Sequence, residues 1–187
     1  IPFNRTTRFI FNPFAKTRKL YRLLHATNLS QRFLVQDISL PQEKTKEFLN
    51  YVNTKFNVYP LWLCPLATGK QDKLSPNCLN SDLVINVGVW GKVQHNFSEF
   101  VVLNRDLEKK VAKLYGRKVL YAHSYYSKNE FWRIYDLKWY NSLRRKYHAE
   151  VVFPNIYKKT FVKEKYVQSI FLGIWKMIES PFKIPFS

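Results

Sequence analysis

The amino-acid sequence predicts an α+β domain of the ferredoxin-like type, with the element order β-α-β-β-α-β. Four short segments alternate in polarity as strands do, and the two longer segments between them show helical spacing. The chain has 187 residues, 46% of them hydrophobic, which is enough for one domain with a buried core. We therefore expect one antiparallel sheet with two helices on one face, and extra helices after the last strand.

The first half of this domain contains two strands and a helix. The first strand is expected near residues 33–40, where most alternate residues are apolar and a proline ends the run. A helix near residues 42–56 follows, because large apolar side chains recur there at spacings of three and four. The second strand, near residues 58–66, has the sequence VYPLWLCPL, in which two prolines flank Trp62 and Cys64.

The second half repeats this pattern of strand, helix and strand. A third strand near residues 82–90 is predicted from DLVINVGVW, and a fourth near residues 117–126 from RKVLYAHSYY. Between them we expect a helix near residues 104–115. It should begin at Asn104, a good N-cap residue, and end at Gly116, which suits a helix C-terminus.

Further helices are predicted after the fourth strand. Ser127 and Glu130 have the spacing of a capping box, which indicates a helix start. The segment LKWYNSLRRKYHAE predicts a helix over residues 137–150, and apolar spacing predicts a short amphipathic helix over residues 170–178.

We divide the chain into three parts. Residues 1–32 are expected to form a basic N-terminal arm, irregular at first and helical from Ala15 onward. Residues 33–159 are expected to form the main domain, and residues 160–187 a basic, aromatic tail. The first residue is Ile1, so we expect a fragment or a processed product. No run of about 18 apolar residues occurs, so the sequence predicts no transmembrane helix within the chain.

The net charge of +18 is concentrated at the two ends. Residues 1–36 hold seven basic and no acidic residues, residues 37–137 fourteen basic and ten acidic, and residues 138–187 ten basic and three acidic. Basic ends interleaved with aromatic residues suit an anionic membrane surface or nucleic acid. A solvated surface that docks on an acidic partner domain explains the same charges equally well.

Several known motifs are missing from the sequence. It holds no GxSxG, HExxH, P-loop or GxGxxG pattern. The two cysteines and four histidines lack the spacings of a zinc site, so we expect no metal and free thiols. The first and third strands lack the aromatic motifs of RNA-recognition modules, so nucleic acid is not expected as a partner.

One face of the predicted sheet is rich in aromatic and small residues. Trp62 and Cys64 share a face of the second strand, and Gly88, which leaves room for close approach by another group, and Trp90 add to it. The fourth strand would contribute residues from Tyr121, His123, Ser124, Tyr125 and Tyr126. An aromatic wall with a few hydroxyls suits a large, flat, apolar ligand. The same residues also suit a second core face packed on another domain.

The segments VYPLWLCPL, VINVGVWG, LYAHSYYSKNEFWRIYD and WYNSLRRKYHAEVVFPNIYKK carry a family resemblance. Together with the initial IPF and RFLVQDISLP, they closely resemble the C-terminal part of the delta(24)-sterol reductases, flavoproteins of the vanillyl-alcohol oxidase type. The resemblance covers roughly residues 1–159, and the tail from Thr160 departs from the family pattern.

The resemblance implies the cap domain of an enzyme of the endoplasmic reticulum membrane that reduces the side-chain double bond of a sterol. It implies FAD, held mainly by an upstream domain absent from this chain, and NADPH as the hydride donor. The oligomeric state does not follow from the sequence. A second interpretation is a non-catalytic fragment that binds a membrane surface or a protein partner through its basic ends.

Reduction of an isolated alkene needs a hydride at one carbon and a proton from an acid at the other, in a dry pocket. We expect the acid to be one of His123, Tyr125 and Tyr126, although a structural role for His123 is equally compatible with the sequence. By the resemblance, His123 or Ser124 faces the flavin ring. The expected substrate contacts are Trp62, Cys64, Gly88, Trp90 and Tyr121.

Overall fold

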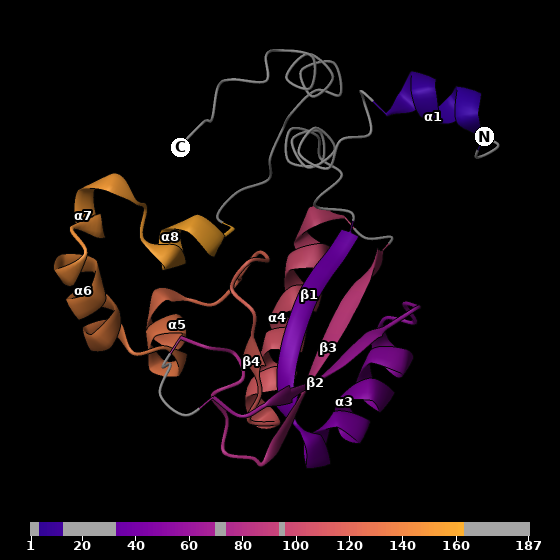
Figure 1. Cartoon of the computed structure of the whole chain (residues 1–187). Coiled ribbons are helices and arrows are strands. Elements are labelled where there is room, and N and C mark those ends of the chain that lie inside the picture. Colours follow the sequence, from indigo (N-terminus) through magenta and orange to yellow (C-terminus); the bar gives the residue numbers. More distant parts are fainter. Residues whose placement is uncertain (1–3, 13–32, 70–73, 94–95, 163–187) are drawn as a thin grey trace. The chain divides into compact units, whose positions relative to one another are not determined.

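The computed structural model of the chain describes residues 4–12, 33–69, 74–93 and 96–162 (Figure 1). The chain divides into two compact units, one formed by residues 33–163 and the other by the two ends. The main unit contains a sheet and all but one of the described helices.

The sheet of the main unit has four strands, β1 (Phe33–Pro41), β2 (Trp62–Ala67), β3 (Leu83–Lys92) and β4 (Arg117–Lys118). Their spatial order is β2-β3-β1-β4, and each neighbouring pair is antiparallel. This is the order of the split β-α-β arrangement, so the predicted α+β fold of the ferredoxin-like type is confirmed. Because β2 lies at the edge of the sheet, it tolerates Pro65, which has no amide hydrogen to donate.

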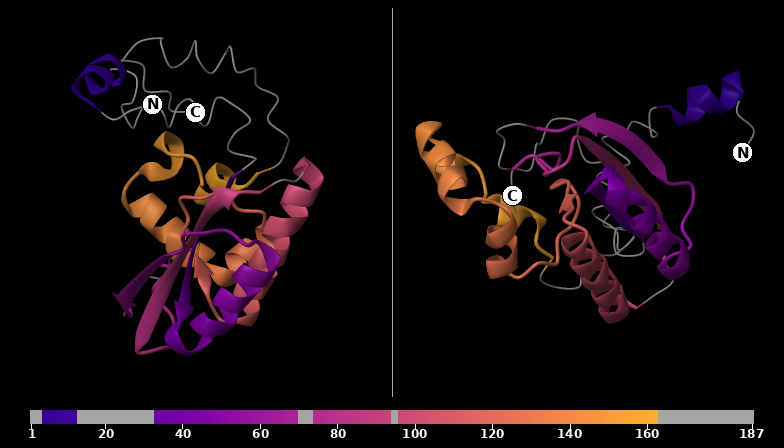
Figure 2. Two further views of the ribbon diagram at one scale, coloured as in Figure 1. Left: turned by 90° about the vertical axis from the view of Figure 1, so that its right-hand side faces the viewer. Right: turned by 90° about the horizontal axis from the view of Figure 1, so that it is seen from below.

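Two helices, α3 (Gln42–Lys55) and α4 (Phe97–Lys113), cover one face of this sheet (Figure 2). Their apolar side chains meet those of β1 and β3 in one core. This core includes Leu34, Ile38, Leu40, Phe48, Val52, Val87, Val89, Leu103, Leu107 and Val111. Both helices therefore pack on the same face, as predicted, and the opposite face of the sheet is left free of them.

Helix α4 starts earlier than predicted. Its N-cap is Asn96, whose side chain accepts a hydrogen bond from the backbone of Glu99, while the Glu99 carboxylate caps Asn96 in return. Asn104, the predicted N-cap, is buried inside the helix, where it accepts a hydrogen bond from Gln36 Nε2 at 2.9 Å. The prediction was wrong because a reciprocal capping box is a stronger start signal than a single asparagine.

The end of α4 also differs from the prediction. The residue with a left-handed backbone after the helix is Tyr115, with φ 58°, and not Gly116. A Cβ atom on Gly116 would lie 2.7 Å from Leu40 Cδ2 and 2.8 Å from the carbonyl oxygen of Ser39. Glycine is therefore required here because the chain passes close to β1, and not to cap the helix.

The fourth strand, predicted over residues 117–126, is wrong beyond Lys118. Arg117 and Lys118 pair with β1, and the N–H of Val119 still donates a hydrogen bond to the carbonyl oxygen of Asp37 at 2.9 Å, after which the chain turns out of the sheet. The side chain of Lys118 provides the reason, because its ammonium group donates a hydrogen bond to the carbonyl oxygen of His123 at 2.8 Å. The chain thus folds back over its own lysine. Ser124 then forms an isolated parallel bridge with Phe161.

Four short helices follow, α5 (Lys128–Ile134), α6 (Leu137–Lys146), α7 (Ala149–Val152) and α8 (Ile156–Thr160). The predicted capping box of Ser127 and Glu130 is confirmed at the start of α5. The helix predicted over residues 137–150 is instead divided into α6 and α7, because His148 between them is left-handed, with φ 51°. A second, smaller core of Tyr126, Phe131 and Tyr135 holds α5 in place.

In the other unit, the structure describes one helix, α1 (Arg5–Phe11). Asn4 and Thr7 cap its start reciprocally, so this part of the arm is regular where an irregular segment was predicted. The predicted helices from Ala15 onward and over residues 170–178 lie outside the described residues.

A buried ion pair joins α4 to β4. The side chains of Lys118 and Glu108 are each 1% exposed, and Lys118 Nζ lies 2.8 Å from Glu108 Oε1. The same carboxylate oxygen accepts a hydrogen bond from the backbone N–H of Tyr125. Burial lowers the pKa of Lys118, and the carboxylate of Glu108 opposes this shift by favouring the charged ammonium.

Glu108→Gln should destabilise the fold strongly, because it leaves the Lys118 ammonium buried without its counter-charge. We expect the free energy of unfolding to fall by about 3–5 kcal/mol, measured by urea denaturation followed by circular dichroism. Glu47→Gln is the matched control, since it removes the exposed partner of Lys110, and it should leave the denaturation midpoint nearly unchanged. Similar midpoints for both variants would contradict this prediction.

Candidate functional site

The sheet face opposite α3 and α4 brings together residues of three strands. The strand register pairs Gly88 of β3 with Trp62 of β2 on one side and with Asp37 of β1 on the other. Trp90 follows two residues after Gly88 and so lies on the same face. We call this set of four residues the Trp62–Trp90 face. Cys64 lies in the next row, where Asn86 pairs with it.

The two tryptophans of this face are largely open to solvent. Trp62 is 59% exposed and Trp90 is 48% exposed, whereas Cys64 is half-buried. Large aromatic side chains that gather on a surface mark contact sites for ligands or partners more often than single exposed apolar residues do. The predicted grouping of Trp62, Cys64, Gly88 and Trp90 on one sheet face therefore matches the geometry of the structure.

Gly88 has a different role from the one predicted. We expected it to leave room for an approaching group, but side chains of the same sheet occupy that space. A Cβ atom on Gly88 would lie 2.7 Å from Asp37 Oδ1, 3.0 Å from Trp62 Cβ and 3.4 Å from Trp90 Cε2. The glycine lets the carboxylate of Asp37 lie over the middle strand, close to both tryptophans.

Asp37 is the residue of this face that the sequence analysis missed. Its Oδ1 atom is buried and has no hydrogen-bond partner within the described part of the chain. A buried, unpaired carboxylate oxygen is costly, so it calls for a donor that a ligand or a partner would bring. Alternation along β1 places the side chain of Asp37 on the sheet face opposite to that of the buried Ile38. This pattern could have identified Asp37 as a residue of the face from the sequence.

The candidates after β4 lie elsewhere, because the chain leaves the sheet before reaching them. Tyr125 belongs to the core beneath the helices and packs edge-on against Phe100 of α4. Tyr126 belongs to the second core. Neither tyrosine therefore shares a face with Trp62, although the predicted strand would have placed one of the two on that face. Tyr121 is half-exposed.

Burial raises the pKa values of both Tyr125 and Tyr126 well above the usual range, and the carboxylate of Glu108 raises them further. Such phenols hold their protons tightly, which disfavours them as acids. The backbone carbonyl of His123 is occupied by Lys118 and Gln36, and its side chain is half-buried.

Ser124, expected to face a flavin, is fully buried. Its hydroxyl has no hydrogen-bond partner among the residues that the structure describes. Its backbone is fixed on both sides, since its N–H donates to Thr160 and its carbonyl accepts from Val162. A flavin contact for Ser124 stays a prediction.

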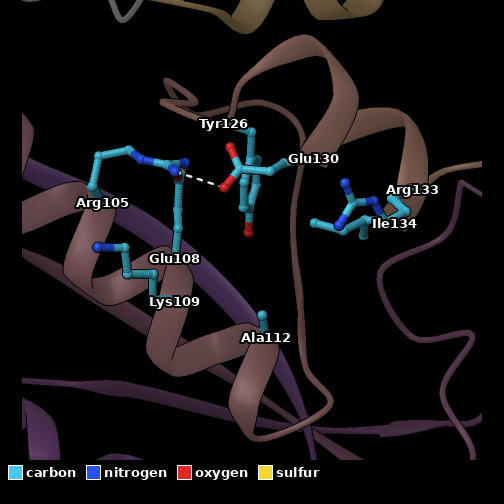
Figure 3. A pocket seen from close by; sticks show the side chains of 8 residues that line it. All are labelled: Arg105, Glu108, Lys109, Ala112, Tyr126, Glu130, Arg133 and Ile134. Carbon is cyan, nitrogen blue, oxygen red and sulfur yellow. Dashed lines mark hydrogen bonds and ion pairs between the residues drawn. The ribbon is translucent and has the colours of Figure 1, made fainter.

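A hollow of about 270 Å³ lies between α4 and α5 (Figure 3). In it, Arg105 Nη2 reaches Glu130 Oε1 at 2.7 Å, while Arg105 Nη1 contacts Glu108 Oε2 at 3.0 Å. The hydrogen bonds from Arg105 and Ser127 lower the pKa of Glu130 to about 2. Arg105, Glu108 and Glu130 are thus paired with one another and tie α5 to α4, while Lys109 and Arg133 also line the hollow.

No three His, Cys, Asp or Glu side chains gather into a possible metal site in the described ranges. Cys64 and Cys78 are free thiols, as predicted. Of the helices that the structure describes, none has the length and apolar character needed to cross a bilayer.

The sequence is similar to curated proteins named delta(24)-sterol reductase, which confirms the resemblance found above. It is 33% identical to the human protein over 143 residues, which are 76% of this chain and 26% of that protein. It is 28% identical to the Arabidopsis thaliana protein over 148 residues, 68% of this chain and 26% of that protein. A homologue from Caenorhabditis elegans is 27% identical over 143 residues, 76% of this chain and 26% of that protein.

This chain thus spans about a quarter of the length of the curated relatives it matches. No family model matches the sequence. No solved structure matches it either.

The ion pair of Arg105 and Glu130 should make stability depend on acid pH. The folded pKa of Glu130, about 2, lies below the ordinary value of 4.5, so the pair contributes fully above about pH 4.5 and is lost as pH falls towards 2. Glu130→Gln should therefore be less stable than the parent at pH 7, by about 1 kcal/mol or less because the pair is partly exposed. Thermal unfolding at pH 7, 4 and 2.5 (about the span of the two pKa values) should show this difference shrink. A constant difference would contradict the assignment.

Proposed function

We propose that this chain is the substrate-covering part of a delta(24)-sterol reductase, an oxidoreductase that reduces the side-chain double bond of a sterol. The observation that carries this proposal is the Trp62–Trp90 face, where two exposed indoles lie beside the buried, unpaired oxygen of Asp37. Similarity to proteins named delta(24)-sterol reductase over 76% of the chain supports the reaction and the substrate class.

A sterol suits this face because most of its surface is flat and apolar. The indole rings of Trp62 and Trp90 offer apolar area that water covers in the isolated chain. Covering that area with hydrocarbon is favourable by roughly 25 cal/mol per Å². Binding would also remove water from around Asp37, which strengthens any hydrogen bond that its carboxylate makes.

The proposed cofactors are FAD and NADPH. The face fits the ring end of a flavin or a substrate held against one, because it combines aromatic surface with a single unpaired carboxylate oxygen. The sequence holds no glycine-rich phosphate loop, so we propose that FAD is held mainly by residues outside this chain. When bound, the reduced flavin supplies the hydride, with NADPH as its source.

The residues of this chain would exclude water, orient the alkene and hold the proton that the second carbon needs. Asp37 is our first candidate for the proton holder, since it is a carboxyl group placed among the indoles of the face. His123 is the second candidate, because it lies in the segment that the resemblance places near the flavin. The proposal assigns sterol contact to Trp62 and Trp90, and leaves Cys64 and Tyr121 as neighbouring contacts.

The resemblance also suggests where the whole protein works. We propose that it acts at the endoplasmic reticulum membrane, which is where sterol substrates partition. The charge of +18 supports contact with an anionic surface.

Trp62→Ala, made in the full-length protein that contains this segment, should weaken apparent sterol binding by about 2–4 kcal/mol, because a large apolar surface is lost. Tyr59→Ala is the matched control, since Tyr59 is equally exposed just before β2 and outside the proposed face. The measurement is the sterol dependence of the single-turnover rate with reduced flavin. Equal effects of the two variants, or unfolding by Trp62→Ala alone, would contradict a sterol contact.

Asp37→Asn and His123→Ala separate the two candidates for the proton holder. The variant that removes the acid should lower the single-turnover rate by about a hundredfold or more at saturating sterol, while the other variant stays near the parent. We expect the large loss for Asp37→Asn. A normal rate in both variants would show that neither residue delivers the proton, and a loss of sterol binding at normal rate would make Asp37 a binding residue.

A further inference from the structure

The turn between α6 and α8 displays three consecutive apolar side chains that are half exposed or more. Val151 is 97% exposed, Val152 66% and Phe153 50%, and they follow one another in sequence. Tyr147, before this run, is also exposed. Figures 1 and 2 show α6 and α7 at the edge of the main unit, beyond β4 and away from β2. We call residues 147–153 the α7 tip.

The α7 tip is held in a fixed shape. The guanidinium of Arg144 donates hydrogen bonds to the carbonyl oxygens of Phe153 at 2.6 Å, Glu150 at 2.9 Å and Pro154 at 3.3 Å. One side chain of α6 thus satisfies three backbone acceptors of the following turn. The apolar residues are therefore presented by an ordered turn, at a low further cost in conformational entropy on binding.

The surrounding segment is strongly basic. Residues 137–160 contain one acidic residue, Glu150, and six basic residues, Lys138, Arg144, Arg145, Lys146, Lys158 and Lys159. Arg145 and Lys146 lie in the last turn of α6, which the Arg144 hydrogen bonds join to the tip. Protruding apolar side chains next to Lys and Arg are typical of surfaces that insert into the headgroup region of anionic bilayers.

A second copy of the chain is a poorer occupant for this surface. Pairing two α7 tips would bring two segments, each with a net charge of +5 over residues 137–160, against one another. An anionic lipid surface instead complements this charge and accepts the valine and phenylalanine side chains. The charge pattern therefore favours lipid.

We propose that the α7 tip is a membrane-contact site, in which Val151, Val152 and Phe153 enter the headgroup region of an anionic bilayer while Arg145 and Lys146 bind lipid phosphates. This inference deepens the membrane association proposed above by assigning it to a surface. The tip lies beyond β4, at the opposite end of the strand order from β2, which carries Trp62.

The test is co-sedimentation of the 187-residue chain with vesicles of phosphatidylcholine containing phosphatidylserine. The double variant Val151→Asp/Val152→Asp should lower the partition coefficient on the order of tenfold or more, because two inserting side chains become charged. Val102→Asp is the matched control, since Val102 is an exposed valine on α4, and it should bind as the parent does. Arg145→Glu/Lys146→Glu should reduce binding by roughly fivefold or more for each residue and weaken its salt dependence.

Several outcomes would overturn this proposal. One is equal binding by Val151→Asp/Val152→Asp and Val102→Asp, and another is equal binding of the parent to pure phosphatidylcholine vesicles. A third is unchanged vesicle binding with loss of sterol reduction when the tip variant is made in the full-length protein, which would show that the tip docks on another part of that protein. Sterol reduction measured in detergent reports the proposed activity separately, and the tip variants should leave it unchanged.

Discussion

The buried ion pair of Lys118 and Glu108 is the interaction on which most of this structure depends. Two full charges lie inside the main unit, and both are satisfied by the backbone as well as by each other. A charge removed from water tolerates little displacement of its partners, because each lost contact leaves a large desolvation cost uncompensated. The pair thus fixes three things together: the path of the chain after β4, the rotation of α4, and, through Arg105, the position of α5.

This constraint explains which features were predictable from sequence. Strands β1 and β3, helix α3 and the capping box before α5 are specified by local patterns, and the structure has them close to where the patterns place them. The end of β4 was not predictable, because it is decided by a lysine that finds its counter-charge on a helix distant in sequence. Alternation suggested which face Asp37 lies on, but the burial of its oxygen depends on Trp62 and Gly88 from two other strands.

The same early exit from the sheet separates two roles that the sequence analysis had combined. Tyr125 and Tyr126 belong to the two cores, whereas the tryptophans of β2 and β3 remain at the surface. In the isolated unit, two tryptophans are exposed to water beside an unpaired carboxylate oxygen. We expect such a surface to bind a ligand or another protein segment. That is consistent with a chain that spans about a quarter of its curated relatives.

Strand β2 lies at the edge of the sheet, and Pro65 within it has a consequence for how the chain behaves alone. A proline inside a paired edge strand fits only with its nitrogen directed away from the neighbouring strand. At that position the free edge presents a ring in place of an amide hydrogen, so a strand of another molecule cannot continue the ladder without losing a bond. The exposed indoles favour association between molecules. Pro65 opposes the growth of an intermolecular β-sheet, and thus aggregation of the chain.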